Sequence, residues 1–187
     1  MTSTLATRLP DIDVLRSVAR AGGLATKAYG CWPHSPDEAQ VPPLPGFIES
    51  TFSPLVAHAA RRALHGRPPT TATTAVILVT ALGDVTSAVA VADAVDGGRR
   101  VGPLMFFQSV PNAVAGHLAA RWGLRGPVVC VSRVETAIEI AAGLIEDGDA
   151  DDALVVWAEV AAGPGDVDRA AAALVFPTAE RVDGDRS

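Results

Sequence analysis

The sequence is poor in cysteine and in paired metal ligands. Its 187 residues include only Cys31 and Cys130, too few for a disulfide framework, which is typical of a protein from a reducing cytoplasm. No two of its four histidines stand at the short spacing of a zinc pair; they are His34, His58, His65 and His117. We therefore predict no metal site and no bound cofactor.

Positive charge is also scarce. Lysine and arginine number 15 against 21 acidic residues, giving a net charge of −6. Nucleic-acid binding needs a clustered excess of basic side chains, so that class is excluded. No apolar run reaches the roughly 18 residues of a membrane span, and the first ten residues lack the pattern of a signal peptide. A soluble, cytoplasmic protein is expected.

Aromatic residues make up only 5% of a chain that is 49% hydrophobic, so alanine and valine carry the apolar content. Small apolar side chains favour thin helices packed closely on a sheet, which is typical of α/β layering. The length suits one domain with a core of its own.

Helix signals recur along the chain. A helix over 53–64 begins at Ser53-Pro54, with Ser53 as the expected cap, and ends at Gly66. Further helices are predicted over 85–95, 109–122 and 134–147, each followed by glycine, and Asp84 or Thr86 is expected to cap the first of them. Residues 1–25 fit either a helix or a short strand.

Four apolar segments are predicted as strands, over 74–80, 127–132, 152–160 and 170–176. Because strands alternate with helices, we expect a mostly parallel sheet with helices on both faces. Residues 1–46, with a proline-rich loop over 31–46, are assigned to the same domain. Residues 177–187 are predicted to form a polar tail.

Residues 103–159 carry an ordered series of family-specific positions. A Pro-x-x-Phe segment precedes an Asn-x-x-x-Gly helix, then a Gly-Leu-x-Gly-Pro turn and a buried strand, and later a Gly-Asp-Ala-Asp-x-Ala-Leu-Val segment leads to a strand ending near Glu159. The matching positions are Pro103, Phe106, Asn112, Gly116, Gly123, Leu124, Gly126, Pro127, Gly148, Asp149, Ala150, Asp151, Ala153, Leu154, Val155 and Glu159. Over 47–176 the chain resembles the N-terminal domain of β-ketoacyl synthases, which implies one half of a thiolase-type fold.

The resemblance also implies catalytic parts that this sequence lacks. A ketosynthase carries a nucleophilic cysteine at the strand-to-helix joint that here follows Ser132, and two histidines from its second half. The joint reads Ser132 to Ala137 without cysteine, and the stretch from Gly126 to Gly148 is shorter than the family pattern. No histidine follows His117. Cys130 is expected to be a buried strand residue that behaves as a small hydrophobe. No catalytic, cofactor-binding or metal-binding residue is predicted.

Three functions follow from these features. The first is a non-catalytic accessory subunit that resembles a chain length factor. It would pair with a ketosynthase or with itself, in polyketide or fatty-acid-like biosynthesis. The second is a divergent enzyme that transfers or modifies acyl groups, using Ser132 or an acid–base pair of His117 and Glu135.

The third is a module that binds an acyl carrier protein or an acyl ligand. Its basic patch would consist of Arg99, Arg100, Arg121 and Arg125. The acidic cluster over 146–152 is interpreted as a solvated loop. Because a half-sized fold exposes surface that the other half covers, we expect at least a dimer.

Overall fold

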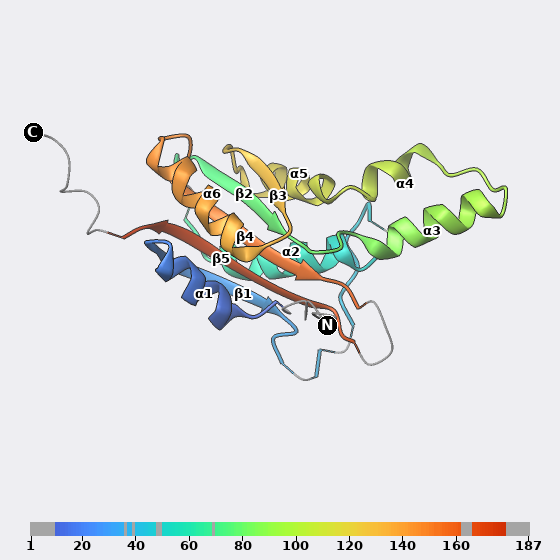
Figure 1. The fold of residues 1–187 in the computed structure, drawn as a ribbon, viewed down its shortest axis with the longest axis horizontal. Coiled ribbons are helices and arrows are strands. Elements are labelled where there is room, and N and C mark those ends of the chain that lie inside the picture. The colour runs from blue at the N-terminus through green and yellow to red at the C-terminus, as the bar shows by residue number, and fades with distance from the viewer. Residues whose placement is uncertain are drawn as a thin grey trace, which may run out of the picture.

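The computed structural model describes residues 10–35, 37–38, 40–47, 50–68, 70–161 and 166–178. A five-stranded sheet lies between two layers of helices, which confirms the predicted α/β class (Figure 1). The strands are β1 (Leu24–Trp32), β2 (Thr74–Val79), β3 (Val128–Val131), β4 (Asp152–Glu159) and β5 (Arg169–Pro177), in the order β1-β5-β4-β2-β3. Strands β3, β2 and β4 are mutually parallel, and β5 runs antiparallel to both β4 and β1.

The two faces of the sheet bury separate apolar clusters. Helices α2 (Phe52–Leu64) and α5 (Pro111–Trp122) cover one face, and α1 (Ile12–Ala21) and α6 (Val134–Glu146) cover the other. Successive residues of a strand point to opposite faces, so Val76 and Leu78 pack toward α2 and α5 while Ile77 packs toward α6. Every residue of β2 is therefore buried, which explains its uninterrupted apolar sequence.

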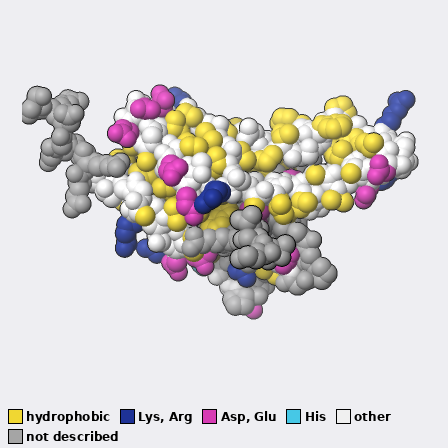
Figure 2. Space-filling model, viewed as in Figure 1, with side chains coloured by type: hydrophobic (Ala, Val, Ile, Leu, Met, Phe, Trp, Pro, Cys, Tyr) yellow, Lys and Arg dark blue, Asp and Glu magenta, His cyan; other side chains and the backbone are white. Residues whose placement is uncertain are grey.

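Helices α3 (Val85–Asp96) and α4 (Pro103–Gln108) leave this sandwich and project beyond the sheet (Figure 1). We call residues 85–108 the arm. Only Ser87 and Ala94 of α3 are buried. The arm exposes large apolar side chains, and hydrophobic atoms gather over it in Figure 2. These exposed side chains are Val89, Val95, Phe106 and Phe107.

Several helix signals behave as predicted. The side chain of Asp84 accepts the amide of Ser87 at 3.0 Å and so caps α3. Gly97 follows α3, and Gly123 ends α5 in the left-handed conformation with φ of 66°. The predicted cap on α2 is wrong, because Ser53 lies inside the helix. The hydroxyl of Ser50 accepts the Phe52 amide at 3.1 Å instead.

Of the two elements considered for residues 1–25, the structure has the helix. Residues 12–21 form α1, whose first amides are capped by Asp11, and β1 follows directly. The sequence analysis missed β1, which pairs with β5 along its length and has a register shift between Thr26 and Ala28. The polar tail was predicted over 177–187, but Pro177 still belongs to β5, where it pairs with Leu24 of β1. The rest of the predicted tail beyond Thr178 lies outside the described residues. Among the described helices, none is long and apolar enough to cross a membrane.

Candidate functional site

The carboxyl ends of β2, β3 and β4 meet at one edge of the sheet, where sites of α/β proteins usually form. The joint between β3 and α6 consists of Ser132 and Arg133, as the sequence predicted. Ser132 is exposed, and its hydroxyl bonds to no described residue. Arg133 occupies the N-cap position of α6, but its side chain makes no capping hydrogen bond. Its Nε lies 3.7 Å from Oε2 of Glu135. The hydrogen bonds of the described histidines do not involve Ser132.

The proposed acid–base pair of His117 and Glu135 is split by the sheet. His117 belongs to α5, and its ring meets that of Phe47 edge-on, with centroids 5.8 Å apart. Glu135 belongs to α6, which packs on the opposite face. The fold therefore does not bring these two side chains to one site.

Cys130 is exposed, which contradicts the expected buried thiol. The reason is that β3 is the edge strand of the sheet, with alternating exposed and half-buried residues, and the sequence analysis had treated it as a buried strand. Partial desolvation still raises the pKa of the Cys130 thiol, which leaves it mainly protonated at neutral pH.

A contact between Cys31 and His34 was missed by the sequence analysis. The sulfur lies 3.9 Å from Nδ1 of His34, and the Cys-x-x-His spacing was the signal available for it. The guanidinium of Arg62 donates to the Cys31 carbonyl at 2.6 Å and pairs with Glu38. Burial raises the pKa of the Cys31 thiol, and Arg62 opposes that rise. The thiol is therefore held in its neutral form, which does not favour nucleophilic catalysis.

Glu159 is a second residue whose role the sequence analysis missed. It ends β4 and is only 6% exposed. Its carboxylate accepts the amide of Ala81 at 2.6 Å, and Thr80 Oγ1 lies 3.4 Å away. Burial raises the pKa of Glu159, although these hydrogen bonds partly oppose the shift. The available signal was an acidic residue directly after the apolar run from Ala153 to Ala158.

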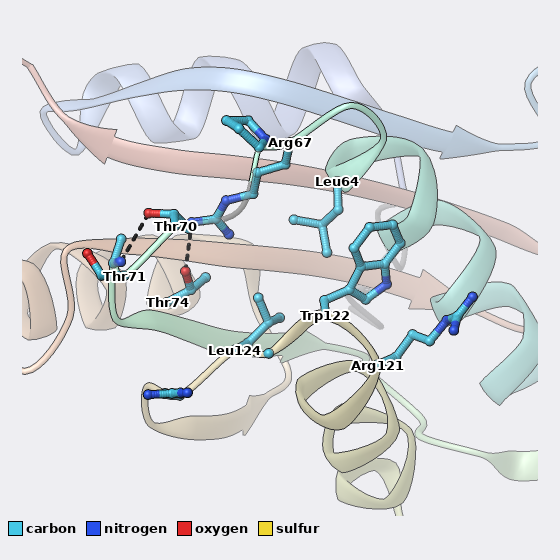
Figure 3. Close-up of a pocket in the computed structure, with 12 residues that line it drawn as sticks. Leu64, Arg67, Thr70, Thr71, Thr74, Arg121, Trp122 and Leu124 are labelled. Carbon is cyan, nitrogen blue, oxygen red and sulfur yellow. Dashed lines mark hydrogen bonds between the residues drawn. The ribbon is translucent and has the colours of Figure 1, made fainter.

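A pocket of about 440 Å³ lies at the opposite edge of the sheet, where β2 begins. Arg67, Arg121, Trp122 and Arg125 line it (Figure 3). Arg67 is already paired, with Asp152 at 2.8 Å. Figure 3 shows the Arg121 side chain extending away from Arg67, so these two positive charges do not converge on one point.

The predicted basic patch is accordingly divided. Arg121 and Arg125 line this pocket, whereas Arg99 and Arg100 follow α3 on the arm. The pocket thus combines three arginines and the hydroxyl groups of Thr70, Thr71 and Thr74 with apolar side chains such as Leu64 and Leu124.

Part of the acidic cluster has a structural role and does not form a merely solvated loop. Asp151 Oδ2 accepts the amide of Thr73 at 2.7 Å. Asp152 Oδ2 accepts from Arg67, whose guanidinium also donates to Thr74 Oγ1 at 2.9 Å. These contacts join the beginnings of β2 and β4. Within the ranges that the structure describes, no group of three potential ligands could hold a metal ion.

Apolar hollows lie where the arm returns to the sandwich. One, of about 580 Å³, is lined by Phe47, Phe107, Val110 and His117 among others. A second, of about 500 Å³, lies beside the 41–54 segment. The Gln108 side chain donates to the carbonyl of Gly46 and ties the end of α4 to this segment.

The outer edge of β3 is open in the described part of the chain. Pro127 and Val131 carbonyls accept amides of Val76 and Thr80 from β2, at 2.9 and 3.0 Å. Because alternate residues of a parallel strand bond to the same side, the backbone groups of Val128 and Cys130 face outward. No described strand pairs with them.

Comparison with known proteins finds a matching protein family and solved structures with a similar fold. The family model for the β-ketoacyl synthase N-terminal domain matches residues 52–183. A solved complex of a ketosynthase (ApeO) with its chain length factor (ApeC) from Xenorhabdus doucetiae contains a chain that matches with a TM-score of 0.66 and 18% identity. That match covers 83% of this chain and 79% of that chain, so the two chains are similar in length.

Two ketosynthase domains of OzmH from Streptomyces albus JA3453 also match. KS8 has 18% identity and a TM-score of 0.43, covering 68% of this chain and 32% of that one. KS7 has 21% identity and a TM-score of 0.45, covering 71% and 28%. The first solved complex, with its higher TM-score, is the one that shows the shared fold.

Proposed function

This chain belongs to the β-ketoacyl synthase N-terminal domain family, and on that premise we propose that it is a non-catalytic partner subunit of a ketosynthase. It would act in the manner of a chain length factor, in polyketide or fatty-acid-like biosynthesis. Its contribution would be a surface that completes the partner's structure, and not a reactive side chain.

The observation that carries this proposal is the open outer edge of β3. The outward amide and carbonyl groups of Val128 and Cys130 pair with no described strand, and the side chains of both residues are exposed. An unprotected strand edge is a template for pairing with another chain, and stable proteins normally cover it. Strand addition across this edge would extend the sheet into a second subunit.

The arm supports the same assignment. Phe106 and Phe107 are 55% and 62% exposed, and Val110 beside them is also exposed. Exposed apolar groups gathered on one element are characteristic of protein–protein interfaces. The arm projects beyond the sheet, so it is placed to contact a neighbouring subunit (Figure 1).

The β3–α6 joint supports a non-catalytic role. It holds Ser132 and Arg133, with no thiol at the start of α6. The fold shared with a chain of a solved ketosynthase–chain length factor complex also supports a partner-subunit role. A role in binding an acyl carrier protein has less support, because the four arginines are divided between the arm and the pocket.

Co-expression with ketosynthases from the same source tests the proposal. We expect one of them to co-purify with this chain as a stoichiometric complex in size-exclusion chromatography with light scattering. If the chain elutes alone beside every candidate but forms a dimer, the partner is a second copy. A monomer at high concentration would overturn both versions.

A separate measurement tests the non-catalytic part. The purified chain is incubated with acyl carrier protein and coenzyme A thioesters, and its intact mass is measured. We expect no change in mass. An acyl adduct that disappears in Ser132→Ala would assign an enzymatic role in place of the one proposed.

A further inference from the structure

The pocket where β2 begins lies at the edge of the sheet away from the β3–α6 joint. Its walls come from four segments of the chain: the end of α2, residues 67–74, the end of α5 and residues 123–125. Its volume of about 440 Å³ falls within the range of small-molecule sites. The described residues that line it carry basic, hydroxyl and apolar side chains, and none of them is acidic.

Backbone contacts fix the shape of this pocket in the free chain. The amide of Arg67 donates to the Leu64 carbonyl at 3.0 Å, and the amide of Leu124 donates to a carbonyl near the end of α5 at 3.0 Å. The turn after α5 lies directly on β2, because the Gly126 amide donates to the Thr74 carbonyl at 3.0 Å. A Cβ added at Gly126 would lie only 2.6 Å from that carbonyl oxygen. A preformed pocket binds a ligand at a smaller entropic cost than one that must first be ordered.

The pocket carries unbalanced positive charge. Arg67 is paired with Asp152 of β4. Arg121 and Arg125, in contrast, are exposed and form no ion pair with the described residues. Arg121 lies in the last turn of α5, where a cation also interacts favourably with the carbonyl end of the helix, but Arg125 lies beyond the helix. Because the whole chain has a net charge of −6, two unpaired arginines at one pocket make it a preferred place for an anion.

Threonine hydroxyl groups add hydrogen-bond donors to this charge. Thr74 Oγ1 accepts from the guanidinium of Arg67 at 2.9 Å. Thr70 Oγ1 accepts from the amide of Ala72 at 3.0 Å. In both threonines the O–H itself donates to no described residue, so it remains available for an incoming acceptor. Arginine nitrogens can only donate, and the ligand group that suits this set of donors is an oxyanion.

Trp122 gives the pocket a flat apolar wall. Its side chain is 36% exposed, whereas those of Trp32 and Trp157 are 6% and 4% exposed. Figure 3 shows its ring beside the Leu64 side chain, and Leu124 also lines the pocket. An open indole next to aliphatic side chains can stack on the apolar part of a ligand. The pocket therefore presents donors and cations together with an apolar surface.

We propose that this pocket binds a small organic anion, which has a flat apolar body and a compact oxyanion head, either a carboxylate or a phosphate ester. Arg125 and the threonine hydroxyls bind the head, and Trp122 and Leu124 contact the body. Both parts of the ligand are needed, because an exposed ion pair by itself adds little affinity in water. The site uses neither the outer edge of β3 nor the arm, so it does not depend on the proposed partner role.

An NMR titration of the full, isotope-labelled chain with assigned backbone amides tests the site. Benzoate and phenyl phosphate carry both parts of the ligand, whereas inorganic phosphate and benzyl alcohol carry one part each. We expect benzoate or phenyl phosphate to shift the amides of residues 70–74 and 121–126 saturably, with a Kd below about 1 mM. The two partial probes should bind about tenfold more weakly or worse. Tighter binding of phenyl phosphate assigns phosphate esters as the ligand class, and tighter binding of benzoate assigns carboxylates.

Matched variants separate the two parts of the site. Arg125→Gln removes one positive charge and should weaken the binding of either anion by about tenfold. The control Arg20→Gln removes the same charge from the exposed end of α1, on the other face of the sheet, and should bind as the wild type does. Trp122→Ala should weaken the binding of phenyl phosphate but not that of inorganic phosphate, because only the apolar contact is lost. Circular dichroism checks folding, and Arg125→Gln, at an exposed position outside helices and strands, decides if Trp122→Ala does not fold.

The absence of saturable shifts up to about 10 mM of either aromatic anion would overturn the proposal, as would shifts confined to other segments. Equal weakening in Arg125→Gln and Arg20→Gln would also overturn it, because the overall charge of the chain would then explain the attraction. Benzyl alcohol bound as tightly as the anions would refute the role of the oxyanion head. None of these results bears on the co-purification that tests the partner role, so the two proposals fail separately.

Discussion

Arg67 and Asp152 form an ion pair of 2.8 Å between side chains that are each only 15% exposed. The pair joins the segment after α2 to the first residue of β4, and Arg67 reaches Thr74 of β2 through the same nitrogen. It thereby fastens together the beginnings of the two central parallel strands. This edge of the sheet is the one opposite to Glu159.

We predict that removing either partner of this ion pair destabilises the folded protein. Asp152→Ala or Arg67→Ala leaves a largely buried charge without its partner, so each should lower the free energy of unfolding by about 3 kcal/mol. The double variant Arg67→Met/Asp152→Leu should lose less than the sum of the two, because it leaves no unpaired charge. Urea unfolding followed by circular dichroism measures all of these, and losses below about 0.5 kcal/mol in both single variants would contradict the prediction.

Alanine substitutions at two glycines are predicted to change the stability of the protein in opposite directions. Gly30 of β1 packs against α2, and a Cβ there would lie 2.7 Å from the Ala63 amide nitrogen. Gly30→Ala should therefore destabilise the protein by about 1–3 kcal/mol, because the helix must move away from the sheet. Gly143→Ala is the control: it lies within α6 with nothing within 4 Å of the added carbon, and it should stabilise by about 0.5–1 kcal/mol. Thermal unfolding of the two variants measures both changes in stability. If both variants were stabilised, or both destabilised, the close contact between β1 and α2 at Gly30 would not explain the result.

A matched pair of variants at Cys130 tests the β3 edge. Cys130→Pro removes an outward-facing amide without removing a hydrogen bond to β2, and should weaken subunit association by about tenfold or more. Cys130→Ser keeps that amide and should associate as the wild type does. Analytical ultracentrifugation over a concentration series gives both constants. Equal weakening in the two variants would point to side-chain packing at this position and not to strand pairing.

His58 is predicted to make stability depend on pH. Its Nε2 donates to the Pro42 carbonyl at 3.0 Å and its Nδ1 accepts from Arg61 at 3.1 Å, an arrangement that requires the neutral ring. Burial lowers the pKa of His58, so its contribution is present above the unfolded pKa of about 6.5 and is lost as pH falls toward the folded value.

Between about pH 7.5 and 5.5, the free energy of unfolding should therefore fall more in the wild type than in His58→Gln, whose amide still donates to Pro42 but does not titrate. Glu159 acts in the opposite sense, because its raised pKa gives stability that is lost as pH rises. Comparing each variant with the wild type separates the two groups. The exposed His65→Gln is the control, and equal pH slopes for His58→Gln and the wild type would refute this role for His58.

Local features of the sequence by themselves determined most of the elements. The apolar run of β2, the cap at Asp84 and the stops at Gly97 and Gly123 depend on neighbouring residues and on backbone conformations that glycine adopts readily. The ordered family positions over 103–159 identified the same family as the model that matches residues 52–183. The absence of a cysteine at the β3–α6 joint is also visible in the sequence alone.

Only the tertiary structure decided which strands pair and which of them is an edge. The sequence of β3, Val-Val-Cys-Val, is apolar at every position, so its own pattern does not reveal that one side lacks a neighbour. Strand β1 is held by β5, far along the chain, and Glu159 acquires its role from a turn 78 residues away. Burial and partners of this kind depend on contacts between distant segments, and therefore they appear only once the chain is folded.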